Sequence, residues 1–294
     1  MFRLAHISDV HLGPLPHFRR RDLMTKRITG YVNWRRNRAK TLGNAVLAAV
    51  IDDMQAVAPD HIAMTGDLVN LSLDAELLAA RLWMEALGDP KNVSYVPGNH
   101  DAYVIGALQK TTQNLANFIG DTVEPNFPSL RIRGDVAIIG VNSARATPVF
   151  IAAGHVSDRQ MLALKTVLEE TGKQGLCRVV MIHHPPVRGA ASRAKRLYGI
   201  HKFQRAVKEA GAELVLHGHT HLQTLNWISG PEKARVPVVS VSAAGQMPGG
   251  KRPAAGWTEF QIERLDVGFS IQMIRRQIID DGSSLAETER LKLS

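Results

Sequence analysis

Residues 97–101, Pro-Gly-Asn-His-Asp, place an amide, an imidazole and a carboxylate in consecutive positions. Residues 93–96 are an apolar lead-in that predicts a buried strand, and the Pro-Gly pair after it predicts a turn. The amide oxygen of Asn99 suits a hard cation, and His100 can donate a proton or a hydrogen bond. Asp101 could fix the tautomer of His100. Taken alone, a polar turn without function would be the simpler interpretation.

Four more clusters of ligand-type residues follow apolar segments elsewhere in the chain. Each comes at the expected end of a strand and close to Gly or Pro, where α/β folds gather their ligands. The clusters are Asp9 with His11, Asp67, His183 with His184, and His219 with His221. Asp9 and His11 are two residues apart, and in an extended backbone such residues point the same way.

The donor types indicate which metals such a site would take. Imidazole, carboxylate and amide donors without cysteine suit Mn, Fe, Zn or a similar ion, and they argue against a closed thiolate zinc site. Seven ligands exceed what one four- to six-coordinate ion needs if a water position is to stay open. Two ions that share a carboxylate fit better, about 3.5–4 Å apart as in two-metal hydrolases.

Composition limits the class of protein without deciding its substrate. The chain has 294 residues and a formal net charge of +9, which favours anionic partners such as phosphate esters, nucleic acid or an acidic membrane surface. Its one cysteine, Cys177, excludes an internal disulfide framework and fits a reducing compartment. No signal peptide or apolar window of transmembrane length is visible, so we expect a cytoplasmic protein, with contact at the inner membrane surface as a further hypothesis.

Residues 17–40, which we call the basic flap, are rich in arginine and lysine interleaved with Phe18, Tyr31 and Trp34. One interpretation is a solvated basic face whose aromatic side chains pack into the body. The other is an amphipathic cationic flap over a site for an anionic or amphiphilic ligand. Because the flap follows the first ligand cluster directly, Arg20 and Arg35 are candidate substrate contacts.

The order of expected elements predicts an α/β fold. Strands and helices alternate up to residue 101, and each strand ends in a polar cluster, as in layered α/β proteins. We expect the second half to form a further, mainly antiparallel sheet. Residues 1–280 are predicted to be a single domain that includes the basic flap, and residues 281–294 a polar, frayed C-terminal tail.

The five clusters together resemble the calcineurin-like metallophosphoesterase family, and they occur in its order over residues 1 to about 245. The matching motifs are Asp9-x-His11, Gly66-Asp67, Gly98-Asn99-His100-Asp101, His183 before Pro185, and Gly218-His219-Thr220-His221. Within the family, the layout most resembles class III cyclic-nucleotide phosphodiesterases. The resemblance implies a four-layer α/β/β/α sandwich of two mixed β-sheets flanked by helices, with a dinuclear metal site at the sheet edge.

The resemblance also implies a role for each matching residue. Asp9, His11 and His221 would bind the first metal, Asn99, His183 and His219 the second, and Asp67 would bridge them. His100, oriented by Asp101, would contact the substrate phosphate and protonate the leaving alkoxide. The two divalent ions would lower the pKa of a shared water, and the resulting hydroxide would attack in line. His183 is favoured over His184 because the family's ligand directly ends the apolar strand, which leaves His184 as a hydrogen-bonding neighbour and candidate substrate contact.

These observations predict a metal-dependent phosphodiester hydrolase. Because small cyclic-nucleotide hydrolases tend to have a shorter loop where this chain has the basic flap, a lipid diester or lipid-linked pyrophosphate is an alternative substrate. A non-catalytic metal-binding scaffold is a second alternative, which the complete motif set argues against. No nucleic-acid polymer is expected as a partner, since no DNA-binding or capping domain follows the last motif. The oligomeric state stays open.

Overall fold

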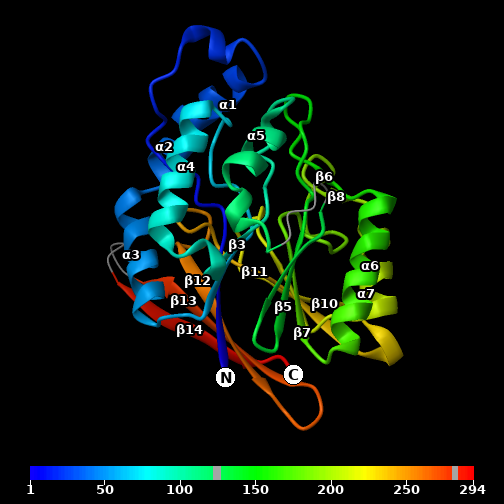
Figure 1. Ribbon diagram of the computed structural model, residues 1–294. Coiled ribbons are helices and arrows are strands. Elements are labelled where there is room, and N and C mark those ends of the chain that lie inside the picture. The colour runs from blue at the N-terminus through cyan, green and yellow to red at the C-terminus, as the bar shows by residue number, and fades with distance from the viewer. Residues whose placement is uncertain (122–126, 280–283) are drawn as a thin grey trace.

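The computed structural model of the protein describes residues 1–121, 127–279 and 284–294 (Figure 1). Two mixed six-stranded sheets pack face to face, and helices cover the outer face of each. Apolar side chains fill all three interfaces between the layers, as the hydrophobic effect requires of sheets with two covered faces. The expected four-layer α/β/β/α sandwich is therefore confirmed.

The first sheet combines the beginning and the end of the chain. Its strands, in order across the sheet, are β14 (Leu285–Lys292), β13 (Phe269–Ile278), β12 (Gly256–Arg264), β1 (Phe2–Ile7), β2 (His61–Met64) and β3 (Val93–Tyr95). β1, β2 and β3 run parallel, whereas β12, β13 and β14 add antiparallel strands at the other edge. The expectation of a frayed tail over residues 281–294 is thus wrong for β14, and residues 281–283 lie outside the described ranges.

The second sheet is parallel at its centre, which corrects the expectation of a mainly antiparallel one. Its strands, in order, are β10 (Leu225–Ser229), β11 (Arg235–Ser240), β9 (Leu214–His217), β7 (Cys177–Ile182), β5 (Val136–Val141) and β4 (Ser129–Arg133). The inner four are parallel to one another, and only the two outermost pairings are antiparallel. A short two-stranded sheet joins β6 (Gly154–His155) to β8 (Leu197–Tyr198).

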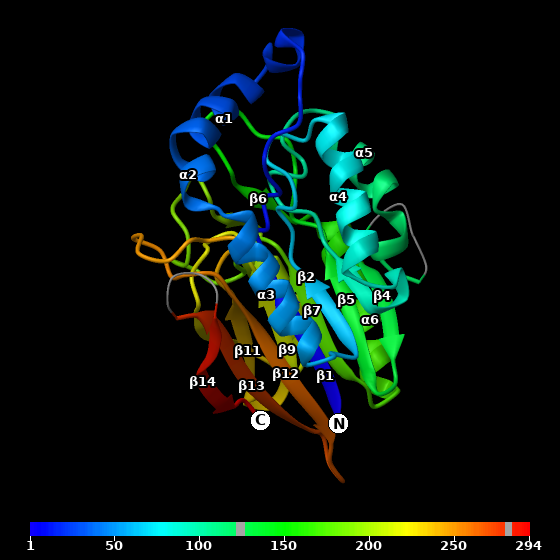
Figure 2. The same ribbon diagram turned by 90° about the vertical axis from the view of Figure 1, so that its left-hand side faces the viewer.

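Amphipathic helices form the two outer layers. α3 (Asn44–Ala56) and α4 (Asp74–Leu87) lie over the first sheet, as Figure 2 shows, and α6 (Asp158–Lys173) and α7 (Ile200–Ala210) cover the second. α5 (Ala107–Asn114) follows the third ligand cluster. None of the helices within the described residues is both long and apolar enough to span a bilayer.

The basic flap is mostly helical and lies at the opposite end of the molecule from the two termini (Figures 1 and 2). It contains η1 (Arg20–Leu23), α1 (Arg27–Asn33), the π-helix η2 (Trp34–Arg38) and α2 (Ala39–Thr41). Phe18, Leu23 and Tyr31 pack against an apolar cluster that includes Tyr103 at the base of the flap. Gly30 does not interrupt α1, and the Tyr103 ring lies so close to it that a Cβ would collide.

Topology brings the ligand clusters together. The parallel strands β1, β2 and β3 of one sheet, and β7 and β9 of the other, all end at the edge below the basic flap. Hydrogen bonds join the sheets there: the Ala244 N–H donates to the Ser8 carbonyl, the His219 N–H donates to the Asp9 carboxylate, and the His183 imidazole contacts the Thr65 carbonyl. The site therefore forms where the carboxyl ends of strands from two sheets meet.

Candidate metal centre

The structure brings all seven residues expected to bind metal into one buried cluster. Each side chain is at most 8% exposed, although all of them except Asn99 are acidic residues or histidines, which normally face water when unpaired. Ligand atoms within 4.8 Å of one another form the sets Asp9–His11–His221, Asp9–Asp67–His183 and His183–His184–His219. Such a convergence of buried polar groups is costly unless something binds them.

Five of these residues have backbone angles in the left-handed region. They are Asp9, His11, Asp67, His219 and His221, with φ between 47° and 69°. Side chains other than glycine rarely adopt this conformation, and its cost is characteristic of functional sites. The sequence predicted that the side chains of Asp9 and His11 point the same way because the backbone is extended. They do converge, but both residues have left-handed backbone angles, so the expected extended geometry is wrong.

The first set of donors comes from the loop after β1 and from the loop after β9. The Nε2 atom of His221 is 3.1 Å from Oδ1 of Asp9. The Nδ1–H of His11 points to the Val69 carbonyl at 3.2 Å, which leaves its Nε2 atom without a hydrogen-bond partner. A histidine held in this way presents a lone pair at a fixed position, as metal-binding histidines do.

Asp67 lies between the two sets. Its Oδ2 atom is 3.8 Å from His11 Nε2 on one side and 3.5 Å from His183 Nε2 on the other. Its Oδ1 atom accepts a hydrogen bond of 2.7 Å from the backbone N–H of His100. Gly98 packs so tightly against this carboxylate that any side chain there would displace it. The geometry suits a carboxylate that bridges two ions.

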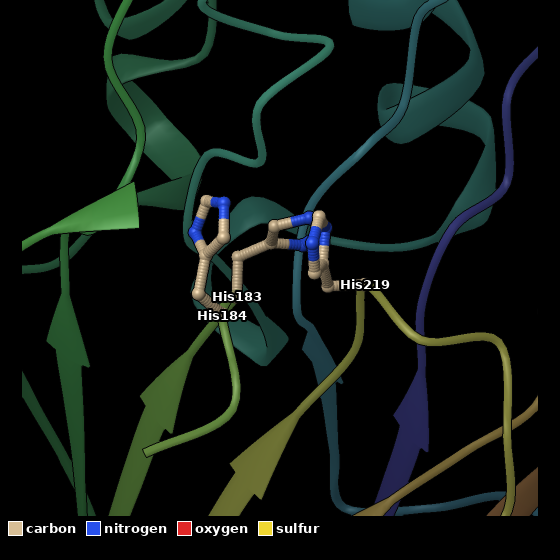
Figure 3. Close-up of side chains that lie close together, drawn as sticks. All are labelled: His183, His184 and His219. Atoms are coloured by element: carbon tan, nitrogen blue, oxygen red, sulfur yellow. The ribbon is translucent and has the colours of Figure 1, made fainter. Parts of the chain in front are cut away.

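The second set comes from the ends of β3, β7 and β9. The His183 Nδ1–H donates to the Thr65 carbonyl at 2.6 Å, and its Nε2 atom is 3.3 Å from Oδ1 of Asn99. The His183 and His219 rings are 5.1 Å apart, and Nε2 of His219 has no hydrogen-bond partner (Figure 3). Two imidazoles and an amide oxygen thus face the same space beside Asp67.

His184 uses both of its ring nitrogens for contacts within the protein. Its Nδ1 atom is 2.8 Å from the Ser143 hydroxyl, and its Nε2 atom is 3.1 Å from the Ala152 carbonyl. The ring also packs closely on Gly154, and it does not reach the cavity wall. Although it lies 4.4 Å from the His219 ring (Figure 3), we regard His184 as a support for the site and not as the substrate contact that the sequence suggested.

The charges of the cluster fit a cation. Burial lowers the pKa of His183, but the charge of Asp67 and the hydrogen bond to it outweigh burial and raise that pKa to about 9. Burial opposes ionisation of Asp9, yet the neighbouring His221 holds the pKa of this carboxyl well below its usual value. The centre therefore carries negative charge that attracts protons, and with the two unpartnered Nε2 atoms it fits divalent metal ions.

His100 is placed beside the metal set but is not part of it. Its Nδ1–H donates to the Asn70 carbonyl at 2.6 Å, and its Nε2 atom accepts a hydrogen bond of 2.7 Å from the Arg38 guanidinium. The Tyr103 ring stacks on its other side at 5.2 Å. Burial and the charge of Arg38 lower the pKa of His100 to about 3.

Asp101 does not orient His100, which corrects the role expected from the sequence. Its carboxylate accepts hydrogen bonds from four backbone N–H groups. The donors are Asp67 at 2.6 Å, Leu68 at 3.0 Å, Val69 at 3.2 Å and Gly98 at 2.8 Å. It therefore fixes the two loops that carry Asp67 and Asn99. The Asn70 carbonyl and Arg38 orient His100 instead, and a backbone carbonyl leaves no signature in a sequence.

A cavity of about 270 Å³ opens onto the centre. Its wall includes Asp67, Asn99, His100, His219 and His221 of the expected site. Four lysine and arginine side chains complete it. Lys26 and Arg38 belong to the basic flap that the sequence suggested as a cover over an anionic ligand, whereas Lys195 and Arg252 were not suggested as substrate contacts.

The two arginines that the sequence suggested as substrate contacts are not on this wall. Arg35 is exposed and does not line the cavity, and the side chain of Arg20 lies outside the described part of the structure. Lys26, Thr29 and Asn33 recur at helical spacing on the cavity side, a signal that the sequence offered. The π-turn over residues 34–38 then shifts the register, so Arg38 faces the site where a regular helix would have placed another residue.

Comparisons with known proteins agree with the fold and the motifs. The family model described as calcineurin-like phosphoesterase matches residues 2–223. No curated protein matches the chain. Among solved structures, a dimetal phosphatase from Danio rerio is 13% identical, with a TM-score of 0.62 over 100% of this chain and 98% of its own.

Two larger proteins share the same fold over about half of their length. A 5'-nucleotidase precursor from Thermus thermophilus is 16% identical, with a TM-score of 0.51 over 99% of this chain and 54% of its own. A purple acid phosphatase from yellow lupin (Lupinus luteus) is 10% identical, with a TM-score of 0.56 over 99% and 53%. At such identities the likeness to solved structures shows the fold alone. The family match rests on the chain's own sequence, and from it we conclude that the chain belongs to the calcineurin-like phosphoesterase family.

Proposed function

We propose that the protein hydrolyses phosphodiesters at a centre of two divalent metal ions. The observation that carries this proposal is the pair of buried donor sets that share the Asp67 carboxylate. Asp9, His11 and His221 would hold one ion, and Asn99, His183 and His219 the other. When bound, the ions would lower the pKa of a water and neutralise phosphate oxygens. A closer relation to class III cyclic-nucleotide phosphodiesterases stays a prediction.

The chain's own residues prepare the site for this reaction. The Val69 and Thr65 carbonyls fix the rings of His11 and His183, so that both Nε2 atoms face the centre without reorganisation. His100 and Arg38 lie together on the cavity wall, where they can bind the phosphate oxygens or the leaving group. Burial of the whole cluster strengthens each of these interactions.

A substrate panel tests the proposal. The protein, stripped with a chelator, is reloaded with Mn, Fe, Zn or Mg and assayed on diesters, monoesters and pyrophosphates. We expect no turnover without metal. With at least one of the four metals, we expect the protein to hydrolyse diesters faster than monoesters. Hydrolysis of monoesters alone would contradict the diester assignment, and lack of any metal-dependent turnover would favour the non-catalytic scaffold.

A second candidate is an amphiphilic substrate taken from a membrane surface. Met24, Ile28 and Val32 are four residues apart in the basic flap and are 83%, 55% and 41% exposed. Phe150, which is 87% exposed, lies on the cavity wall next to a loop that the flap contacts through Lys26. Exposed apolar side chains among arginines and lysines are typical of segments that insert into the interface of an anionic bilayer.

An apolar pocket next to the centre supports the same candidate. It measures about 250 Å³ and is lined by Trp34, Leu42 and Leu47 among others. It shares His11 and Arg38 with the metal centre and its cavity. An apolar group attached to the scissile phosphate could therefore occupy it.

Vesicle sedimentation tests this candidate. The protein is mixed with anionic or neutral vesicles at several salt concentrations, and we expect binding to the anionic vesicles only, weakened by salt. A variant with Met24, Ile28 and Val32 changed to Ser should lose binding. As a matched control, Leu162→Ser removes an apolar side chain of similar exposure from α6 and should bind normally. Equal sedimentation of all forms, or none, would contradict the membrane role.

A further inference from the structure

The cavity over the metal centre carries more positive charge than a simple diester needs. Lys26 and Arg38 reach it from the basic flap, Lys195 from the segment before β8, and Arg252 from the loop before β12. Among the described residues that line the cavity, Asp67 is the one acidic residue, and its carboxylate faces the metal site. Three separate segments thus bring cations to one cavity.

Among the described residues, neither Lys26 nor Arg38 has a hydrogen bond or ion pair to a carboxylate, although the charges of Asp67 and Asp9 act on Arg38 through space. Lys26 donates to the Thr147 hydroxyl at 2.8 Å and to the Ile151 carbonyl at 3.0 Å, and its ammonium lies 4.7 Å from the Tyr103 ring. Arg38 donates to the His100 ring. Each of these partners fixes a position without neutralising the charge.

The other two cations add to the same field. The Arg252 guanidinium contacts the His221 ring, and Lys195 lines the same cavity as both arginines. Burial together with Arg252 and Arg38 lowers the pKa of Lys195. Lys195 and Arg252 are exposed, so water screens part of the repulsion among the four cations, and an anion bound between them would relieve the rest.

We propose that these four cations bind a second phosphate group of the substrate, so that the natural substrate is a pyrophosphate-linked diester. This rests on the proposed function, because one phosphate must occupy the metal centre. A simple diester carries a single negative charge, which two divalent ions already balance. A neighbouring phosphate is the group that would use the four additional cations.

The position of Arg38 fits the bond that would break. Water adds to the phosphorus at the metal centre, and the bond from that phosphorus to the bridging oxygen breaks. The bridging oxygen keeps the electron pair and leaves as part of the second phosphate, so that two phosphomonoesters form and share the two protons of the water. Arginine neutralises such an anionic leaving group without giving up a proton, and Arg38 lies beside His100 where it can do so.

Steady-state kinetics with metal-loaded enzyme provides the first test. The substrates are bis(p-nitrophenyl) phosphate with one charge, p-nitrophenyl phosphate with two charges on one phosphate, and ADP-ribose with its pyrophosphate link. We expect the highest kcat/KM for ADP-ribose. Lys195→Met and Lys26→Met should lower that value by about 10- to 100-fold, the range for a lost hydrogen bond between charged groups, and lower the others by less than about 3-fold.

Two variants serve as matched controls. Arg193→Met and Arg36→Met remove exposed charges from the same segments without touching the cavity, and both should behave as the wild type. Equal losses on all three substrates would mean that the cations act only through the general field, which would overturn the second-phosphate site. Turnover of simple esters with no preference for ADP-ribose would overturn it too, while the proposed function would stand.

A binding measurement separates recognition from turnover. Isothermal titration compares methylenediphosphonate, a non-hydrolysable pyrophosphate analogue, with methylphosphonate on the same metal-loaded proteins. Lys195→Met should weaken the diphosphonate by at least about 5-fold and the monophosphonate by less than about 2-fold. Unchanged diphosphonate affinity in both Lys195→Met and Lys26→Met would contradict the proposal. Lack of any metal-dependent turnover by the wild type would instead contradict the proposed function.

Discussion

His183 and His184 are adjacent in the chain, yet their hydrogen bonds give them different tasks. Nδ1 of His183 contacts a backbone carbonyl, and its Nε2 atom faces Asp67 and Asn99. Both nitrogens of His184 face protein groups. A single residue step at the end of β7 therefore separates a candidate ligand from the side chain that supports it.

This difference gives a prediction for the two alanine variants. His183→Ala should lose the ion of the second set, because no other described donor replaces its Nε2 atom between Asp67 and Asn99. His184→Ala should keep the metal content but lower the free energy of unfolding by about 1–3 kcal/mol, since the Ser143 hydroxyl and the Ala152 carbonyl lose their partner. Elemental analysis and urea denaturation of both variants decide the matter. The reverse pattern would assign the ligand to His184.

Because Nε2 of His100 accepts a hydrogen bond from Arg38 and the pKa of the ring is lowered to about 3, His100 can protonate a leaving group only if the bound substrate raises that pKa. Its replacement distinguishes this role from phosphate binding alone. His100→Ala should leave the metal content unchanged and lower the rate by about 10²–10⁴, the usual range for a lost general acid. The loss should be smaller for an activated aryl ester than for an alkyl ester, because a good leaving group needs little protonation. Equal losses on both would show that His100 only positions phosphate. A loss of metal would show that it is a ligand.

At the scale of elements, the sequence predicted the helices and strands that its own periodicity defines. The apolar segment expected as a strand before Pro97 is β3, and β1, β2, β7 and β9 precede the other ligand clusters as predicted. The partners of the strands were harder to predict, because a strand's own pattern does not say which sheet it joins. β12 and β13 return to β1 in the first sheet, and β14 was missed since its polar residues resemble a solvated tail. The shifted register of the π-helix likewise hid Arg38.

The pairing of β2 with β3 contains a titratable group. The His61 ring is buried and 2.8 Å from the Ser94 hydroxyl. Burial, helped by Arg131 and Arg133, lowers the pKa of His61 to about 3. The unfolded chain takes up a proton on this residue below about pH 6.5, whereas the folded protein does not. Proton uptake by the unfolded chain therefore lowers the free energy of unfolding as the pH falls from about 6.5 towards 3, and His61 has no such effect above pH 6.5.

The variant His61→Gln removes this pH dependence and can keep a hydrogen bond to Ser94. Urea denaturation between pH 7 and pH 4 should show a shallower loss of the free energy of unfolding for the variant than for the wild type. Ser94→Ala serves as the control, because it lowers stability at every pH while the histidine still titrates. Equal slopes for His61→Gln and the wild type would contradict a neutral, buried His61.

At the scale of the whole molecule, the site exists because two sheets end at one edge. The motifs predicted the residues of the centre, since each follows an apolar strand and the order of strands fixes where they meet. The sequence could not predict the part of the cavity wall that lies outside the basic flap. Lys195 and Arg252 lie far apart in the chain, and only the packing of their loops brings them to the metal centre.

The central claim is that one chain holds two divalent ions that share Asp67. Elemental analysis of the active protein should find about two ions per chain, and Asp67→Ala should lose both together with activity. Asp135→Ala, which removes an exposed carboxylate paired with Arg264, should keep both ions. One ion or none in the wild type, with hydrolysis that survives chelation, would contradict the claim.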